Sequence, residues 1–212
     1  MKFGGDKMKF DHKLAEFVGI MLGDGYISYP KLPRIKISLN SVTDKDYLCF
    51  VHDLLTSLFN TKVKIRHRKN ENTSNLFIFN KKLIEELINE VGLVPSPKWN
   101  RAKIPDWILS GGFKKFVLRG YFDTDGCVVR TNNNGTIYPR LEMKISPSPM
   151  QEQFIAILKD MSFNFGVYDI GKGKVRIQIN GKKGLKQWSD MIGFSNKKHK
   201  DKCHKFLFHH NL

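Results

Sequence analysis

The sequence predicts an α+β fold of two pseudo-symmetric halves, each with the element order αββαββα. Two observations predict it. The segment FVGIMLGDG at 17–25 returns as LRGYFDTDG at 118–126, so that two glycines and one aspartate recur 101 positions later. After both copies, apolar and polar residues alternate, which is typical of strands with one buried face. Such a repeat indicates a chain built from a duplicated unit.

The elements can be assigned in order in each half. A first helix is expected from near Asp11, or from near Ser110 in the second half, up to the Asp-Gly pair. The first half then predicts strands 25–29 and 34–40, a helix 44–59, strands 62–68 and 75–80, and a helix 81–91. The second half predicts strands 126–130 and 140–146, a helix 149–162, strands 166–170 and 174–180, and a helix 182–192.

These elements divide the chain into a first half at 1–94, a connecting segment at 95–112 and a second half at 113–212. Three prolines and a Ser-Gly-Gly punctuate the connection, with room for one helical turn at Asp106–Leu109. Trp99, Ile104, Trp107 and Ile108 are expected to be buried there, unlike residues of a flexible linker. The end of the chain is interpreted as a basic tail.

The composition is strongly basic, with 36 Lys and Arg against 20 Asp and Glu, a net charge of +16 and a pI of about 9.8. Such a charge is costly through self-repulsion unless a polyanion binds it, so nucleic acid is the expected partner. An anionic membrane surface is the rival, but no separate Lys-rich amphipathic helix stands out to bind one. No apolar run approaches the ~18 residues that span a membrane.

Three dispersed cysteines do not form a disulfide framework, and no targeting signal is evident. We therefore expect an intracellular protein, in the cytoplasm of a prokaryote or in an organelle matrix. The group Cys203, His204, His209 and His210 lacks the paired spacing of a zinc site. The sequence also lacks a GxxxxGK[ST] phosphate-binding loop, so ATP use is not expected.

Four of the predicted strands place basic and amide side chains on one face and apolar ones on the other. Arg and Lys suit guanine, and Asn and Gln suit adenine, in the major groove of DNA. The alternative is a solvated sheet face on which lysines only maintain solubility. The candidate DNA-binding residues are Arg34, Lys36, Ser38, Asn40, Lys62, Lys64, Arg66, Arg68, Arg130, Arg140, Glu142, Lys144, Ser146, Lys172, Lys174, Arg176, Gln178 and Asn180.

The two Asp-Gly helix ends suggest a metal site. A carboxylate at a helix C-terminus is unfavourable against the helix dipole, and two brought together repel each other. A hard divalent cation such as Mg²⁺ relieves both effects. Small residues one turn apart, Gly19 and Gly23 in one helix and Gly120 and Thr124 in the other, would let the two helices approach closely. One such helix end alone would be interpreted as structural; two matched copies favour a site at Asp24 and Asp125.

FVGIMLGDG and LRGYFDTDG resemble the paired motifs of the LAGLIDADG homing endonucleases, and the resemblance extends over about 11–206. It implies motif helices packed at a central pseudo-twofold axis and two saddle-shaped antiparallel sheets that grip double-stranded DNA. It implies a Mg²⁺-dependent monomer, with Mn²⁺ as a plausible substitute, that cuts both strands across the minor groove. The metal ligands implied are Asp24, Asp125 and the carbonyls of Gly23 and Thr124.

The sequence departs from the family pattern at the first motif acid, which is Leu22 in one half and Asp123 in the other. This position varies in the family, so Asp123 is interpreted as a structural residue, or as one that supports a metal ligand, rather than as a ligand itself. The block around Gly92 resembles a family segment that supplies a catalytic lysine, with Lys103 and Lys98 as candidates. In the second half Lys202 is the choice, although the Ile-Pro that follows Lys103 is missing there. Each lysine could equally contact the phosphate backbone.

The main hypothesis is thus a site-specific endonuclease encoded within an intron or in a free-standing frame. Because the chain starts at Met1 and ends in His-His-Asn-Leu, we do not expect an active intein. The alternatives are an RNA maturase, with host intron RNA as partner, and a DNA-binding regulator that does not cleave. Retention of both Asp24 and Asp125 favours the nuclease.

Overall fold

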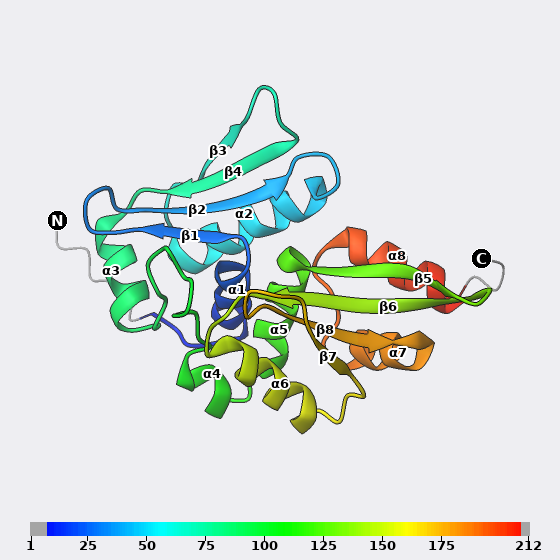
Figure 1. Cartoon of the computed structure of the whole chain (residues 1–212). Helices are drawn as coiled ribbons and strands as arrows, with labels where there is room; N and C mark the ends of the chain where they lie inside the picture. The colour runs from blue at the N-terminus through cyan, green and yellow to red at the C-terminus, as the bar shows by residue number, and fades with distance from the viewer. Residues whose placement is uncertain (1–7, 209–212) are drawn as a thin grey trace.

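The computed structural model describes residues 8–208 and confirms the duplicated αββαββα architecture (Figure 1). The first half contains α1 (His12–Leu22), β1 (Gly25–Ser28), β2 (Arg34–Asn40), α2 (Lys45–Phe59), β3 (Lys64–His67), β4 (Thr73–Ile78) and α3 (Lys81–Asn89). The second half contains α5 (Lys114–Asp125), β5 (Gly126–Asn133), β6 (Thr136–Ile145), α6 (Met150–Asp160), β7 (Gly166–Asp169), β8 (Val175–Asn180) and α7 (Gly181–Met191).

Two further helices lie outside this repeat. The turn expected in the connecting segment is α4 (Asp106–Ser110), and it is packed rather than free, because Ile104 and Ile108 are fully buried. Trp99 was expected to be buried as well, but nearly half of its surface is exposed. The basic tail was also a wrong expectation up to residue 208: Lys197–Phe208 form α8, which buries His199, Cys203 and Phe206. His209 and His210 lie outside the described residues.

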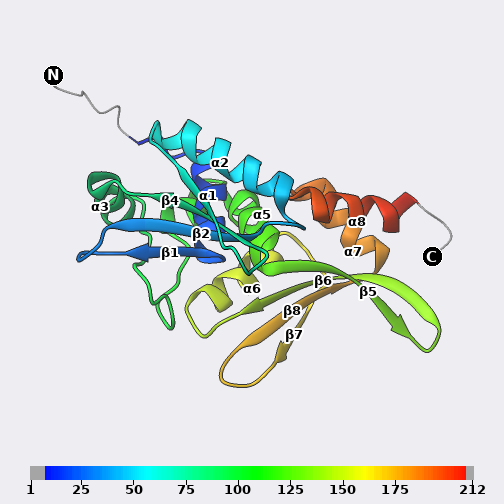
Figure 2. The same cartoon turned by 90° about the horizontal axis from the view of Figure 1, so that it is seen from above.

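The two antiparallel sheets have the same strand order, β1-β2-β4-β3 and β5-β6-β8-β7. Their register is also equivalent. Gly25, directly after the first motif, pairs with Ile37, and Gly126, after the second, pairs with Met143. Figure 2 shows α2 on one side of the first sheet and α7 and α8 on the same side of the second, so that the opposite faces of both sheets are left open.

The expected division into an apolar and a polar face holds for β2, where Ile35, Ile37 and Leu39 are buried. It fails for β3, in which all four residues are exposed, including Ile65. β3 is the outer strand of its sheet, and no helix covers enough of it to bury its apolar side chain.

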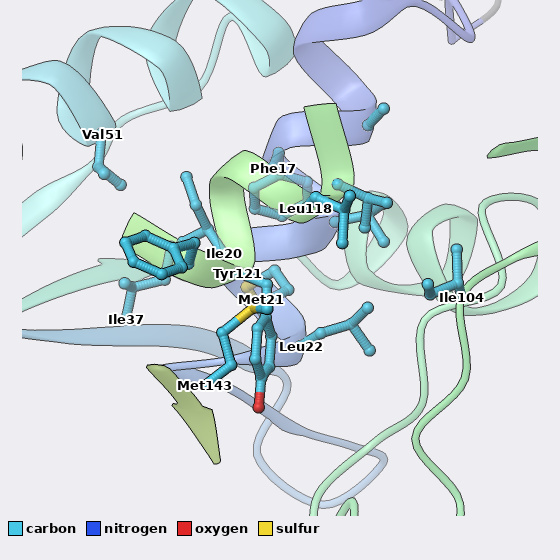
Figure 3. Packing of buried hydrophobic residues seen from close by; sticks show 14 of the residues in the cluster. Phe17, Ile20, Met21, Leu22, Ile37, Val51, Ile104, Leu118, Tyr121 and Met143 are labelled. Atoms are coloured by element: carbon cyan, nitrogen blue, oxygen red, sulfur yellow. The ribbon is translucent and has the colours of Figure 1, made fainter. Parts of the chain in front are cut away.

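The centre of the molecule is the contact between α1 and α5. Every residue of α1 from Leu14 to Leu22 is buried, although a helix on a protein surface would bury only one face. Figure 3 shows Phe17, Ile20 and Met21 of α1 in the same cluster as Leu118 and Tyr121 of α5. α1 begins at Asp11, whose carboxylate accepts hydrogen bonds from the backbone N–H groups of Lys13 and Leu14 at 2.9 and 3.1 Å. The two motif helices therefore pack against each other in the core, and their C-terminal ends lie side by side.

Candidate functional site

The two motif carboxylates lie at adjoining helix ends. Asp24 stands between α1 and β1, and Asp125 is the last residue of α5. Gly23 brings the ends together: a Cβ at this position would lie 2.1 Å from Thr124 Oγ1 and 3.0 Å from Asp125 Oδ2. A larger residue at 23 would push Asp125 away, so the glycine sets the approach of the two acids.

The surroundings of both acids disfavour negative charge. Burial, followed by repulsion from Asp125, raises the pKa of Asp24 to about 7. Burial also raises the pKa of Asp125, and Lys98 opposes that rise. Asp125 lies in the wall of a concave depression, so that protein atoms surround it on several sides. Its side chain is nevertheless accessible to solvent, because the depression is open. A cation at this position would remove the electrostatic penalty that both acids experience.

Lys98 lines both depressions, the one that contains Asp24 and the one that contains Asp125. Its Nζ donates hydrogen bonds to the carbonyl oxygens of Met21, Leu22 and Gly23 at 2.7, 2.8 and 2.7 Å. These carbonyls belong to the end of α1, where backbone acceptors lack partners within the helix. Burial lowers the pKa of Lys98 to about 8, against the opposing attraction of Asp125 and Asp24. Lys98 thus caps α1 and supplies positive charge to the carboxylate pair.

A second lysine, from the other half, acts on Asp24 through its charge. Lys198 forms an ion pair with Asp44 at 2.7 Å, and Asn196 Nδ2 donates to the same Asp44 carboxylate at 2.8 Å. The charges of both Asp44 and Lys198 act on the pKa of Asp24, Asp44 raising it and Lys198 lowering it. The start of α2 in the first half is therefore joined to the start of α8 in the second, beside the site.

The other two candidate lysines are placed differently. Lys103 is exposed and does not line either of the depressions that contain Asp24 and Asp125. Lys202 is exposed as well, and its Nζ donates to the carbonyl of Val128 in β5 at 3.3 Å. The structure thus brings Lys98 and Lys198 toward the acids. Lys202, the lysine predicted for the second half, and Lys198 lie in the same basic stretch of sequence.

Asp123 binds backbone N–H groups of the segment before α8. Its Oδ2 accepts hydrogen bonds from the backbone N–H groups of Ser195 and Asn196, at 2.5 and 3.1 Å. Only 1% of its surface is exposed, and burial raises its pKa to about 7. Asp123 anchors the segment before α8 to α5, which fits its interpretation as a structural acid. Ser195 and Asn196 themselves carry no sequence signal for this role.

The side chains at this position are suitable ligands for a divalent cation, because such an ion prefers carboxylate oxygens. The two carboxylates also lie in surroundings that disfavour their negative charge, which a cation would offset. Asp24 and Asp125 would hold it. The carbonyl of Gly23 is bonded to Lys98, and Thr124 Oγ1 donates to the carbonyls of Gly120 and Tyr121 within its own helix. Over residues 8–208 no cluster of three or more His, Cys, Asp or Glu side chains suited to a metal occurs.

The open face of the first sheet carries alternating aromatic and basic side chains. One row crosses all four strands as Tyr26, Lys36, Phe77 and Lys64. The cations lie over rings: Lys36 over Tyr26 at 5.2 Å, Lys64 over Phe79 at 5.5 Å and Arg66 over Phe77 at 5.6 Å. These aromatic residues were not predicted, although the alternation of Asn75 and Phe77 in β4 and Phe79 just after it was a local signal for them.

The second sheet carries a more polar face. Lys144, on β6, pairs with Arg176 on β8, and Arg176 lies over the ring of Tyr168 at 5.8 Å. Glu142 is buried between Arg140, at 2.5 Å, and Gln178, at 3.0 Å. The predicted residues of this half therefore interact with one another before any partner binds.

The remaining candidates are distributed as follows. Arg34 and Ser38 lie on β2, and Ser38 Oγ donates to Asn75 Oδ1 at 2.8 Å. Asn40 is exposed, and its Oδ1 is occupied by the turn that follows β2, where it accepts from the N–H groups of Val42 and Thr43. The others stand on strand surfaces or at strand ends: Lys62 and Arg68 flank β3, Arg130 is on β5, Asn180 ends β8, and Ser146, Lys172 and Lys174 lie in the adjoining loops.

No helix within residues 8–208 has the length and apolar character needed to cross a membrane.

Comparisons with known proteins agree with this architecture. A LAGLIDADG meganuclease, I-AabMI, bound to uncleaved DNA has 12% identity and a TM-score of 0.63, with 93% of this chain and 89% of that chain covered. I-DmoI in complex with DNA and Mn has 16% identity and a TM-score of 0.59, with 87% and 98% covered. The N-terminal LAGLIDADG domain of WhiA has 18% identity and a TM-score of 0.55, with 91% and 86% covered. At these identities the likeness shows the fold.

A curated relative by sequence is the replication factor C small subunit of Methanocaldococcus jannaschii, with 25% identity over 199 residues. The alignment covers 89% of this chain but only 10% of that protein, so the chain spans about one tenth of the length of its relative. The sequence profile of the LAGLIDADG DNA endonuclease family matches residues 16–186, which include both Asp-Gly motifs and both sheets. The chain therefore belongs to the LAGLIDADG DNA endonuclease family.

Proposed function

We propose that the protein is a site-specific endonuclease that cuts both strands of double-stranded DNA with Mg²⁺ and acts as a monomer. The observation that carries the proposal is the pair Asp24 and Asp125, held at adjoining helix ends between two sheets with open basic faces. A single chain provides both acids and both sheets, so no second copy is required to complete the site.

The sheets supply affinity and position. Their Lys and Arg side chains neutralise phosphates and release counterions, which makes binding steeply dependent on salt. A polar sheet face can enter the major groove and contact base edges. With one sheet on either side of the motif helices, the DNA between the two contacted segments lies over Asp24 and Asp125.

Asp24 and Asp125 would hold the divalent cation, which would supply an activated water and stabilise the leaving oxygen. Lys98 contributes a positive charge fixed by three backbone carbonyls, and this charge stabilises a phosphate beside the acids. Lys198, fixed by Asp44, is the corresponding group on the side of Asp24.

The test uses Asp24→Asn and Asp125→Asn, with Asp53→Asn as matched control on the exposed surface of α2. A randomised duplex library is incubated with each protein and Mg²⁺, and the cut ends are sequenced. We expect the wild type and Asp53→Asn to cut a discrete set of sites, and each motif variant to lose at least 100-fold in rate while still binding the same duplexes in Ca²⁺. Full cleavage by both motif variants would overturn the assignment of the site.

The alternatives predict other outcomes. A regulator would bind a discrete set of duplexes and cut none of them with Mg²⁺ or Mn²⁺. A maturase without nuclease activity would bind a structured intron RNA more tightly than any duplex in the library. Either outcome would overturn the proposed cleavage.

A further inference from the structure

We propose that Phe77 is a specificity-determining residue that contacts the 5-methyl group of thymine, and that this contact is confined to the part of the DNA bound by the first sheet. The inference rests on the proposed function, because it presumes that the open sheet faces contact duplex DNA. Beyond the proposed function, it identifies one base that the protein recognises. It also predicts that the two halves of the DNA target differ in sequence.

The position of Phe77 is the first step. Its neighbours in β4, Leu76 and Ile78, are buried against the helices, so Phe77 projects from the opposite, open face. Phe79, half exposed, lies nearly parallel to it at 5.7 Å. Two phenyl rings side by side on an open sheet face form an apolar patch, which the side chains of Lys64 and Arg66 cover only in part.

The charge around this patch indicates the occupant. Lys36 and Lys64 flank Phe77 in the same row, and Arg66 lies over its ring. A neutral protein partner would leave these three cations buried without counter-charge, whereas the phosphates of a duplex neutralise them. Arg66 and Phe79 also occupy the ring surface of Phe77 that a stacked, unpaired base would need. A base edge in the major groove fits this arrangement better than a single strand.

Thymine is the base that suits an apolar side chain. It alone among the four presents a methyl group in the major groove; cytosine has only a hydrogen at that ring position, and the purines present hydrogen-bond donors and acceptors. A phenyl ring placed against an amino group or a purine oxygen would exclude water without offering a hydrogen bond. Phe77 therefore both favours thymine and disfavours the alternatives.

The second sheet lacks this feature at the equivalent position. When the two registers are aligned on Gly25 and Gly126, the row of Phe77 corresponds to Cys127, Glu142, Gln178 and Gly166. Gln178 replaces Phe77, and Glu142 replaces Lys36. Carboxylate and amide groups recognise bases by hydrogen bonds, as Glu does with cytosine and Gln with adenine. The two halves of the target should therefore differ at this row, although the protein fold is nearly symmetric.

The experiment compares thymine with uracil, which differ only by the methyl group. Duplexes are selected from a randomised library by binding to the wild-type protein in Ca²⁺, then resynthesised with deoxyuridine in place of thymidine. Dissociation constants for both forms are measured with wild type, Phe77→Ala, Phe77→Leu and the matched second-half variant Gln178→Ala. Thermal unfolding confirms that each variant is folded.

We expect the uracil form to bind wild type about four-fold more weakly, the equivalent of one buried methyl group. Phe77→Ala should bind both forms equally, Phe77→Leu should retain part of the preference, and Gln178→Ala should keep the four-fold ratio whatever its overall affinity. Equal binding of both forms by wild type, or an unchanged ratio in Phe77→Ala, would overturn this inference and leave the proposed function standing. A library that yields no enriched duplex would overturn both.

Discussion

Gly19 and Gly120 face each other across the contact between α1 and α5. A Cβ on Gly19 would lie 2.3 Å from the carbonyl oxygen of Val117, and one on Gly120 would lie 2.1 Å from that of Glu16. Each helix thus presses its glycine against the backbone of the other, with no flexible side chain available to move aside. The distance between the two helices, and with it the distance between Asp24 and Asp125, is set by these glycines.

Gly120→Ala should therefore destabilise the protein and separate the two acids. We expect a loss of about 1–3 kcal/mol in the free energy of unfolding, typical of an overpacked core, as measured by urea denaturation. The matched control is Gly184→Ala in α7, where the new methyl would meet a side-chain methyl of Ile179 rather than backbone. A Gly120→Ala protein as stable as the control, with an unchanged cleavage rate, would contradict this account of the contact.

Lys98→Met should change the Mg²⁺ concentration needed for cleavage and the maximal cleavage rate in different ways. Loss of the positive charge removes repulsion toward an incoming cation, so half-maximal cleavage should require less Mg²⁺. The maximal rate should nevertheless fall at least ten-fold, because the charge that stabilises the phosphate is gone. Single-turnover cleavage across a Mg²⁺ titration measures both quantities.

Lys103→Met is the control for this substitution, since Lys103 is exposed and outside the depressions that contain the acids. It should match the wild type in rate and in Mg²⁺ requirement. If Lys103→Met shows the larger defect in maximal rate, the assignment of Lys98 as the lysine that acts at the acids is wrong.

The duplicated fold and the position of the acids could be predicted from sequence because their signals are local. Each Asp-Gly pair follows an apolar, helix-like segment and recurs 101 positions later, and alternation over seven residues identifies β2. The choice between Lys198 and Lys202 could not be predicted, because it depends on how Asn196 docks against Asp44, which lies 152 residues away. The alternation around Phe77 was a local signal, but its place beside Lys36 could not be predicted, because it depends on the register of two strands distant in sequence.

α8 was missed because its signal is weak. Its buried residues, His199, Cys203 and Phe206, follow helical spacing, but lysines surround them and one of the three is a histidine. A basic stretch of this composition is typical of a solvated tail. The packing of α8 depends on the apolar surface that Phe122 and Phe194 offer to His199, and no local pattern reveals that surface.

Asp123→Asn should distinguish the structural acid from the metal ligands. An asparagine side chain still offers one oxygen to the backbone N–H groups of Ser195 and Asn196, so we expect a modest loss of stability, about 1 kcal/mol. Cleavage and its dependence on Mg²⁺ should be retained, unlike in Asp24→Asn. Asp123→Leu, which offers no acceptor, should lose more stability in thermal unfolding. Loss of Mg²⁺-dependent cleavage in a folded Asp123→Asn protein would instead make Asp123 part of the metal site.

His199 should make the stability of the protein depend on pH. Its ring is buried against Phe122 and Phe194, both ring nitrogens lack a hydrogen-bond partner among the described residues, and burial lowers its pKa to about 3 from 6.5. Lys198 and Lys202 lower the pKa further, and Asp44 opposes them. Between pH 6.5 and 3 the unfolded chain binds a proton that the folded protein does not, so stability is present above pH 6.5 and falls as the pH decreases.

The slope due to this group is at most about 1.4 kcal/mol per pH unit. Asp24 and Asp123 contribute with the opposite sign, because their raised pKa values favour protonation in the folded state. The His199 contribution is therefore obtained as the difference in unfolding free energy between wild type and His199→Phe at each pH. This difference should shift in favour of the variant as the pH falls from 6.5. A constant difference for His199→Phe over this range would show that the ring is not held neutral by its burial.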